Sequence, residues 1–369
     1  GDVVKIEASS KSVIGDRFWL LNLDMVEQQT GNVIDYNYVG KDALNGSIIQ
    51  FDTGCVLYSK LRPNLNKVVI PSKDGFATSE MLPLRPNTKM LTREYLTVFL
   101  RSDSFVTWAV SKTAGAKMPR LGSKELLGKE IPLPSISEQM RIAGQFAKVD
   151  ELIALRKEQL AKLDQLVKSR FIELFGDPVD NPKNYLVKSL QELIDMGYIT
   201  YHLDGNHGGD YPRSEEFVDS GVPYIGANSI VNGKIDFSMA KFLTAERAGK
   251  LRKGIAQNDD VLFAHNATVG PAVVLKTTEP KVILSTSLTA YRCDKSRLLP
   301  NYLKAYMQSD GFVRQYSSEM KQTTRNQVPI TAQKKYLFLV PPIVEQKQFA
   351  VFVEQTDKSK LAIQQSLEK

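Results

Sequence analysis

The sequence LPSISEQ at residues 133–139 returns as VPPIVEQ at residues 340–346, 207 residues later. Both copies place proline a few residues before a Glu-Gln pair, and a long stretch without proline follows each copy. Such a pattern is typical of the start of an α-helix, because proline is tolerated in the first turn but not in the helix interior. The motif therefore predicts two long helices, one beginning at each copy.

The same offset relates other segments on the N-terminal side of this motif. SDSFV at residues 102–106 returns as SDGFV at residues 309–313, again 207 residues later. CVLY at residues 55–58 matches DVLF at residues 260–263 with an offset of 205, a change of the size that loop insertions produce. Because the matches keep their order and nearly keep their offset, we interpret the chain as one unit written twice.

The predicted fold class is α+β. Each copy begins with strand-like apolar runs separated by Gly, Pro and Asn, and short helical patterns follow, as in a mixed α/β globule. We expect two pseudo-symmetric globular domains separated by two long helices that pair as an antiparallel coiled coil. The expected parts are a first globular domain 1–137, a central helix 138–176, a linker 177–186, a second globular domain 187–344 and a C-terminal helix 345–369.

The central helix carries apolar residues at spacings that alternate between four and three, which is typical of a coiled coil. Ser137 is the expected N-cap. A short linker favours antiparallel pairing, because parallel pairing would require the chain to return along the whole helix. The alternative is that each apolar stripe packs on its own globular domain. The predicted seam residues are Ile142, Phe146, Val149, Ile153, Leu160, Leu163, Val167, Leu174, Phe349, Val353, Ile363 and Leu367.

Composition excludes several classes of protein. Of the 369 residues, 42% are hydrophobic, which is enough to build cores and excludes wholesale disorder. No apolar run approaches the roughly 20 residues that span a bilayer, so no membrane partner is expected. Two cysteines cannot form a disulfide framework, which favours a reducing, cytoplasmic location. The 48 Lys and Arg against 41 Asp and Glu permit a nucleic-acid partner.

Four segments carry a resemblance to a known family. They are IPLPSISEQ at residues 131–139, DELIALRK at 150–157, LDQLVKSRF at 163–171 and FGDP at 175–178. Together they resemble the specificity subunit of type I restriction–modification systems. The resemblance is specific in the helices and weak in the globular domains, which vary in that family because they read different DNA.

The resemblance implies a function and a set of partners. In that family, two target recognition domains bind the halves of a bipartite site in double-stranded DNA. The helices set the spacing and dock two methyltransferase subunits, and motor–nuclease subunits complete the restriction enzyme. The resemblance places S-adenosylmethionine, ATP and Mg²⁺ on those partner subunits and none of them on this chain.

The residues themselves also argue against catalysis by this chain. The Asn/Asp-Pro-Pro-aromatic loop that an amino-methyltransferase needs is lacking, since NPKN at residues 181–184 fails at required positions. The glycine-containing stretches that come nearest to a phosphate-binding loop have the wrong spacing between their glycines and the lysine that follows. His202, His207 and His265 are not joined by a cluster of Cys or carboxylates, so we expect no metal site and interpret His202 and His207 as solvated loop residues.

Two stretches in each globular domain suit base recognition, which uses Arg, Lys, Asn, Gln, Ser and Thr on loops. Residues 59–67 align with 265–268, and residues 112–120 align with 319–327. The alternative for each stretch is an ordinary polar loop. The predicted DNA-binding residues are Ser59, Lys60, Arg62, Asn64, Lys67, Lys112, Thr113, Lys117, Arg120, His265, Asn266, Thr268, Lys321, Gln322, Thr323, Thr324, Arg325, Asn326 and Gln327.

The leading hypothesis is therefore a non-catalytic subunit that reads DNA sequence. Two alternatives belong to other classes. A two-headed protein scaffold would show no salt-dependent affinity for DNA, whereas phosphate contacts make DNA affinity fall steeply with salt. A stand-alone DNA-modifying enzyme would transfer methyl groups without any partner.

Overall fold

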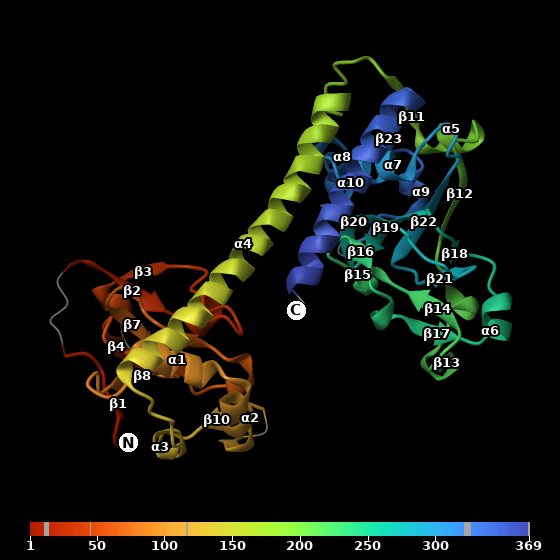
Figure 1. Cartoon of the computed structure of the whole chain (residues 1–369). Coiled ribbons are helices and arrows are strands. Elements are labelled where there is room, and N and C mark those ends of the chain that lie inside the picture. The colour runs from red at the N-terminus through yellow and green to blue at the C-terminus, as the bar shows by residue number, and fades with distance from the viewer. Residues whose placement is uncertain (11–14, 45, 116, 321–325, 368–369) are drawn as a thin grey trace. The chain divides into compact units, whose positions relative to one another are not determined.

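The computed structural model describes residues 1–10, 15–44, 46–115, 117–320 and 326–367. The chain divides into two compact units, Gly1–Leu155 and Arg156–Lys369, which we describe separately as unit 1 and unit 2. Helix α4 (Ile136–Phe175) crosses this boundary, so each unit contains about half of it (Figure 1). Within the described ranges, no helix combines the length and the apolar character needed to cross a bilayer.

Unit 1 is built on two four-stranded sheets. Strand β5 belongs to the first sheet, and its side chains enter the cores of both. One sheet has the strand order β1-β8-β5-β6, and the other has the order β3-β2-β7-β4 with a parallel β2–β7 pair. In β5, Val56 and Tyr58 face the core under α1 and α2, whereas Leu57 faces the core of the second sheet. A strand buried on both faces explains why its sequence is continuously apolar. The bounds are β1 (Val4–Ile6), β2 (Arg17–Leu21), β3 (Asn37–Gly40), β4 (Ile48–Phe51), β5 (Val56–Ser59), β6 (Val68–Val69), β7 (Gly75–Thr78), β8 (Met81–Pro86), α1 (Arg93–Arg101), α2 (Asp103–Ser111), β9 (Thr113–Ala114), β10 (Arg120–Leu121) and α3 (Ser123–Gly128).

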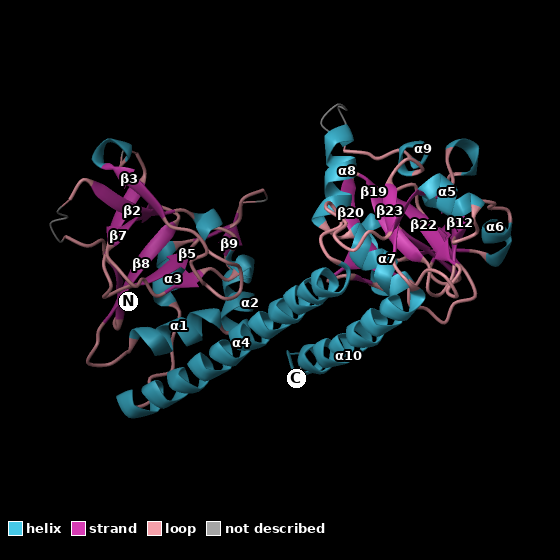
Figure 2. Ribbon diagram, turned by 90° about the horizontal axis from the view of Figure 1, so that it is seen from above, coloured by secondary structure: helices cyan, strands magenta, loops and turns pink. Residues whose placement is uncertain are grey.

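Unit 2 repeats this plan, as the sequence predicts. Its sheets have the orders β12-β22-β19-β20 (Figure 2) and β13-β17-β14-β21-β18, with a parallel β14–β21 pair. In β19, Val261 and Phe263 face the core under α7 and α8, whereas Leu262 and Ala264 face the other core. The bounds are β11 (Leu186–Ser189), α5 (Leu190–Asp195), β12 (Ile199–Asp204), β13 (Phe217–Val218), β14 (Val222–Ile225), β15 (Ile230–Val231), β16 (Lys234–Ile235), β17 (Lys241–Leu243), α6 (Ala245–Gly249), β18 (Ile255–Ala256), β19 (Val261–Asn266), β20 (Thr268–Val274), β21 (Val282–Leu284), β22 (Leu288–Cys293), α7 (Pro300–Met307), α8 (Asp310–Met320), α9 (Ile330–Gln333), β23 (Leu337–Val340) and α10 (Ile343–Leu367).

Both long helices begin before the predicted residues. Helix α4 starts at Ile136 and α10 at Ile343, two residues ahead of the expected starts. The predicted N-cap of α4 was wrong, because the hydroxyl of Ser135 accepts from the amide of Glu138 at 3.3 Å, while Ser137 lies inside the helix. Hydrogen bonding, rather than residue type alone, decides which of two nearby serines caps a helix.

Within unit 2, the C-terminal half of α4 contacts α10. Phe171 and Phe175 lie 5.7 and 5.6 Å from Phe349, measured between ring centroids. Further along, Lys360 donates to the carboxylate of Asp164 at 2.5 Å. Residue numbers fall along α4 as they rise along α10, so the contacting segments run in opposite directions.

The predicted seam has a different outcome in each half of α4. Phe171 and Phe175 are fully buried, although the predicted heptads missed them. The other seam residues of unit 2 are buried or half-buried: Leu160, Leu163, Val167, Leu174, Phe349, Val353, Ile363 and Leu367.

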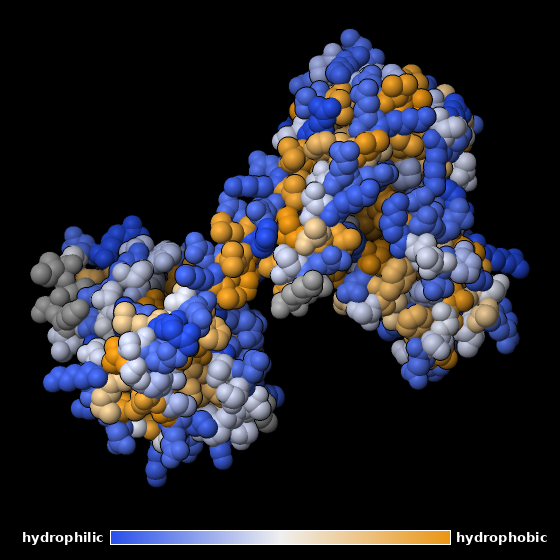
Figure 3. Space-filling view, in the orientation of Figure 1, coloured by the Kyte–Doolittle hydropathy of each residue, from blue (hydrophilic) through white to orange (hydrophobic). Residues whose placement is uncertain are grey.

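In unit 1 the seam prediction was wrong for Ile142, and the other seam residues there are exposed. Ile142 packs on the core of unit 1, which is the alternative that the sequence left open. Phe146, Val149 and Ile153 are 54%, 51% and 36% exposed, and the described contacts of α10 with α4 lie in unit 2. Figure 3 shows hydrophobic surface on the middle of this helix.

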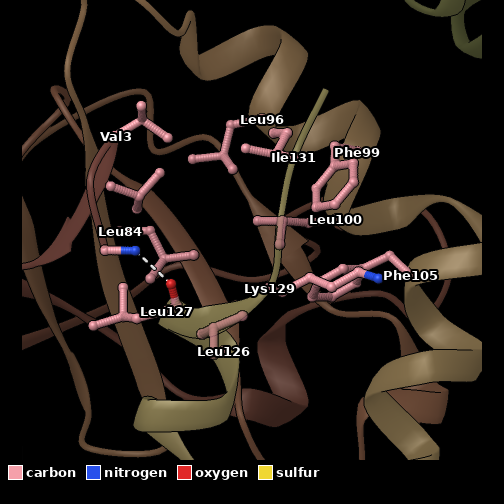
Figure 4. A pocket seen from close by; sticks show the side chains of 12 residues that line it. Val3, Leu84, Leu96, Phe99, Leu100, Phe105, Leu126, Leu127, Lys129 and Ile131 are labelled. Carbon is pink, nitrogen blue, oxygen red and sulfur yellow. Dashed lines mark hydrogen bonds between the residues drawn. The ribbon is translucent and has the colours of Figure 1, made fainter. Parts of the chain in front are cut away.

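Unit 1 also carries a pocket with apolar walls beside α1 and α3 (Figure 4). Leu84, Leu96 and Phe105 line it, and the amino group of Gly1 donates to the carbonyl of Leu127 at its rim. The corresponding residues of unit 2 lie in a core that is filled by Leu190 and Leu193 of α5. Apart from Lys129 and the amino group of Gly1, the residues that line this pocket are apolar, so it offers few groups that could recognise DNA.

Candidate nucleic-acid interface

In unit 1, the loop after β5 is joined to a short segment that we call the strap, residues 119–121. The amide of Arg62 donates to the carbonyl of Pro119 at 2.8 Å, and the amide of Leu121 donates to the carbonyl of Lys60 at 2.9 Å. Between these two bonds, Leu61 forms an isolated bridge with Arg120. The structure therefore brings together residues from the two stretches that the sequence singled out.

Unit 2 contains the same arrangement, with its strap at residues 326–328. The amide of Ala267 donates to the carbonyl of Asn326 at 3.0 Å, and the amide of Val328 donates to the carbonyl of His265 at 2.8 Å. Asn266 forms the intervening bridge with Gln327. These residues are offset from those of unit 1 by 205 in the loop and 207 in the strap, which are the offsets of the sequence repeat.

The loop turns at an unusual backbone position in both units. Arg62 has φ 50° and Ala267 has φ 65°, which is the left-handed region that side chains other than glycine seldom adopt. For a non-glycine residue that conformation costs roughly 1–2 kcal/mol. Such strain, kept at the same place in two copies and held by the strap, is typical of functional loops.

The exposed side chains of this loop-and-strap surface differ between the units. In unit 1, Arg62, Asn64 and Arg120 are exposed and Lys60 is half-buried. Arg120 is held in place because its guanidinium donates to both carboxylate oxygens of Glu80, at 2.9 to 3.2 Å. Unit 1 therefore offers cationic groups.

Among the described residues of unit 2, the groups at the corresponding loop and strap positions are neutral. Thr268 and Asn326 are exposed, while Asn266 and Gln327 are half-buried. Amide side chains carry both a donor and an acceptor, so they can pair with a base edge without adding charge. The predicted residues Lys321, Gln322, Thr323, Thr324 and Arg325 lie outside the described residues.

Further predicted residues of unit 1 lie on the β9–β10 hairpin, which ends in the strap. Lys112 and Lys117 are exposed, whereas Thr113 is half-buried and its hydroxyl donates to the carbonyl of Val110 at 2.8 Å. The two lysines thus extend the basic surface of unit 1, while Thr113 closes the end of α2.

Two predicted residues are buried and support the loop, and a third is half-buried with its ammonium group bonded inside unit 1. Ser59 is 3% exposed and donates to the carbonyl of Leu61, and His265 is 1% exposed and bonds the carbonyl of Val328. Lys67 points inward, with its ammonium group donating to the carbonyl of Leu23 at 2.5 Å, and burial lowers its pKa despite the opposing effect of Asp24. Polar residue type alone does not reveal that a side chain faces inward.

Known proteins share the duplication of this chain. The family described as type I restriction modification DNA specificity domain matches the chain twice, at residues 22–165 and 182–369. The chain belongs to this family. The predicted resemblance is thereby confirmed, and the two matched segments are called below the first and second specificity domains.

Curated relatives of the chain are specificity subunits. The type I restriction enzyme EcoDI specificity subunit of Escherichia coli is 29% identical over 154 residues, which covers 41% of this chain and 34% of that protein. The MjaVIII specificity subunit of Methanocaldococcus jannaschii is 23% identical over 302 residues, covering 77% of this chain and 68% of that protein. The chain thus aligns with about a third of the E. coli relative.

Solved structures share the fold of the two specificity domains at low sequence identity. A chain from work on complex assembly and conformational transition of the type I R-M system has a TM-score of 0.57 at 17% identity, covering 100% of this chain and 93% of that one. The type I restriction–modification S subunit from M. genitalium has a TM-score of 0.55 at 14% identity, covering 99% and 89%. Both likenesses support the mixed helix-and-strand fold.

The second specificity domain contains a buried polar network that the sequence analysis missed. The side-chain oxygen of Gln333 accepts from the hydroxyl of Tyr291 at 2.6 Å and contacts the imidazole of His202 at 3.1 Å. Its amide nitrogen donates to Thr289 at 3.1 Å and to the carbonyl of Val328 in the strap at 3.2 Å. The network therefore ties the strap to the sheet.

The two histidines predicted to be solvated have different outcomes. His202 lies in β12 and is buried, so its interpretation as a solvated loop residue was wrong; burial lowers its pKa to about 4. His207 is exposed and pairs with Asp204 at 2.7 Å. In the part of the chain that the structure describes, no group of three or more His, Cys, Asp or Glu side chains is placed to hold a metal ion. Alternation along β12, with Tyr201 and Leu203 on the opposite face, is the signal that could have placed His202.

Proposed function

We propose that the chain is the non-catalytic DNA-recognition subunit of a type I restriction–modification complex, in which each specificity domain reads one half of a bipartite site. The loop-and-strap surface is the observation that supports this most strongly. One backbone arrangement is built twice, with cationic side chains in unit 1 and amide side chains in unit 2. Two readers with the same scaffold and different side chains suit a site with two different halves.

In this proposal, α4 and α10 set the spacing between the half-sites and dock two methyltransferase subunits. The contacts between the C-terminal half of α4 and α10 in unit 2 support a paired spacer. The exposed Phe146, Val149 and Leu152 of α4 offer an apolar surface to a docking partner, since contiguous exposed apolar side chains mark interaction sites. Methylation with S-adenosylmethionine, and ATP- and Mg²⁺-dependent cleavage by motor–nuclease subunits, would then occur on the partners.

Mapping of DNA methylation tests this function directly. The chain would be co-expressed with the methyltransferase encoded beside it, and methylated adenines would be mapped across the host genome. We expect a split motif with a fixed, unspecified spacer, and no such motif when either protein is expressed alone. Methylation without this chain, or at a single unsplit motif, would contradict the proposal, and salt-independent binding to DNA would favour the protein scaffold.

A further inference from the structure

Gln139 is the last residue of the repeated motif and lies in the first turn of α4. Its side chain is fully buried. Its oxygen accepts from the amide of Thr92 at 2.9 Å, and its nitrogen donates to the carbonyls of Met90 at 2.8 Å and Pro134 at 2.9 Å. One amide thus connects the start of the helix to the turn before α1 and to the segment that enters the helix.

Gln346 repeats these bonds in the first turn of α10. It is also fully buried. Its oxygen accepts from the amide of Leu299 at 2.8 Å, and its nitrogen donates to the carbonyls of Arg297 at 3.2 Å and Pro341 at 2.8 Å. Each of the three partners is offset by 207 residues from the corresponding partner of Gln139.

Three hydrogen bonds to backbone groups on two segments hold a side chain in one orientation, because each bond weakens steeply outside its preferred distance and angle. Breaking such a buried set leaves backbone donors and acceptors without partners, which is costly. A helix held in this way in its first turn can tilt or rotate against its own domain only by breaking the set. The duplicated glutamine therefore acts as a joint between each domain and the helix that follows it.

We propose that Gln139 and Gln346 are positioning residues that fix the direction in which each spacer helix leaves its specificity domain, and so fix the accepted spacer length of the DNA site. This inference rests on the proposed function. A stiff joint makes the complex discriminate between spacers, because one base pair more or less both shifts and rotates one half-site relative to the other. A loose joint would tolerate both changes.

The two joints are supported unequally by the residues that follow them. Beyond Gln346, α10 also buries Phe349, Val353 and Thr356 in unit 2. Beyond Gln139, the unit 1 part of α4 buries only Ala143 among its described residues, with Ile142 half-buried. Gln139 therefore carries a larger share of its joint than Gln346 does.

The experiment uses the full chain assembled with its methyltransferase subunits. Gln139→Met and Gln346→Met keep the length of the side chain and remove its hydrogen bonds. Binding would be measured to duplexes that carry the mapped motif with its natural spacer and with spacers one base pair shorter and longer. We expect the preference for the natural spacer to fall about tenfold in Gln139→Met and about threefold in Gln346→Met, with binding to duplexes carrying one half-site unchanged.

A matched variant separates positioning from loss of stability. Phe51→Leu perturbs the second core of unit 1, which contains no residue of the joint, and should lower thermal stability without relaxing the spacer preference. An unchanged preference in Gln139→Met, or an equal relaxation in Phe51→Leu, would overturn the inference. If Gln139→Met does not fold, an unchanged preference in Gln346→Met overturns it instead. Absence of any spacer preference in the unsubstituted complex would count against the proposed function itself.

Discussion

Units 1 and 2 share one backbone plan, yet they stabilise it with different chemistry. Under the strap of unit 1, Ile6, Leu84 and Leu126 belong to an apolar core. At the corresponding places of unit 2 stand His202, Tyr291 and Gln333, which form a hydrogen-bonded network. Strand register establishes the equivalence, because Ile6 pairs with Leu84 as His202 pairs with Tyr291. The plan therefore depends on strand pairing and on the strap, and it tolerates either apolar or polar filling.

Each unit also contains a buried aspartate–arginine ion pair, and the two pairs differ in the number of hydrogen bonds between their side chains. In unit 1, Asp52 accepts one bond from the guanidinium of Arg85 at 3.0 Å. Burial raises the pKa of Asp52, but the bonds from Gly54 and Arg85 outweigh it and hold that pKa below its usual value. In unit 2, Arg292 donates two bonds to Asp260, at 2.9 and 2.8 Å, in the fork geometry that makes such pairs strong. Arg85 and Arg292 correspond in the repeat, whereas Asp52 lies three residues before Cys55, the residue that matches Asp260, so the two units pair equivalent arginines with aspartates from different positions.

The largest expected effect comes from breaking these pairs. Asp260→Ala leaves Arg292 without its forked partner, and loss of one member of a buried pair costs about 3–5 kcal/mol of unfolding free energy. Asp52→Ala removes one bond from Arg85 together with the bonds from Gly54 and Ser9, and should cost less, about 2 kcal/mol. Urea unfolding can follow the units separately, because both tryptophans, Trp19 and Trp108, lie in unit 1. Tryptophan fluorescence therefore reports unit 1 while circular dichroism reports both units.

For Asp260→Ala, the fluorescence transition should stay where it is while part of the dichroism transition moves to lower urea. For Asp52→Ala, the fluorescence transition itself should move. A loss from Asp52→Ala that equals or exceeds the loss from Asp260→Ala would contradict the expectation that the forked pair contributes more stability.

The second prediction concerns acid. Because burial lowers the pKa of His202 to about 4 from an ordinary 6.5, the unfolded chain binds a proton in this interval that the folded unit 2 does not. Unit 2 should therefore lose roughly 3 kcal/mol of stability as pH falls from about 6.5 to about 4. His202→Ile installs the residue of unit 1 and should remove much of this dependence. Unfolding by urea at several pH values measures it.

The fluorescence transition of unit 1 serves as the internal control for the acid experiment, because acid also protonates carboxylates in both units. The informative quantity is the difference between the unsubstituted chain and His202→Ile in the dichroism transition. His265 also has a pKa lowered by burial, so a residual acid dependence of the same sign should survive the substitution. An identical pH dependence in the two proteins would exclude His202 as its source.

The third prediction tests whether the equivalent strap residues read bases. Arg120 and Gln327 occupy the same strap position, and arginine prefers guanine whereas glutamine prefers adenine in the major groove. Gln327→Arg should shift one position of the half-site read by unit 2 towards guanine, with a change in discrimination of about 1–3 kcal/mol. Methylation mapping would reveal the shift, and the half-site read by unit 1 should not change.

Arg120→Gln provides the reciprocal variant, and it also releases Glu80. Glu80→Gln alone is therefore the matched control, since it frees Arg120 without changing the strap. Changes in both half-sites from either strap substitution would argue that the strap acts through overall stability and does not contact bases.

The duplication, the mixed fold and the two loop stretches could be predicted, because a repeat offset and the types of residue in a loop can be read directly from the sequence. Phe171 and Phe175 were missed because a heptad scan looks only for side chains that face one partner helix, whereas these two pack on Tyr302 of α7 as well as on Phe349 of α10. Ser59 and His265 are polar and were therefore predicted to be exposed, but their positions in the paired strands place both side chains on the buried face. The network around Gln333 depends on side chains about 130 residues apart, and no local pattern reveals such contacts.

The smallest expected effect comes from removing the surface ion pairs that the two halves of α4 form. In unit 1, Asp150 of α4 accepts from Arg101 at 3.2 Å, and in unit 2 Asp164 accepts from Lys360 at 2.5 Å. Both aspartates are more than half exposed, so Asp150→Asn and Asp164→Asn should each cost less than about 1 kcal/mol, and the cost should vanish near 1 M salt. In unit 2, Phe171 and Phe349 already hold α10 to α4. In unit 1, the pair with Arg101 contacts α4 eleven residues beyond Gln139. Asp150→Asn should therefore lower the protection of the α4 amides from hydrogen exchange more than Asp164→Asn does. Equal protection in the two variants would mean that apolar packing adds nothing to how firmly unit 2 holds this helix.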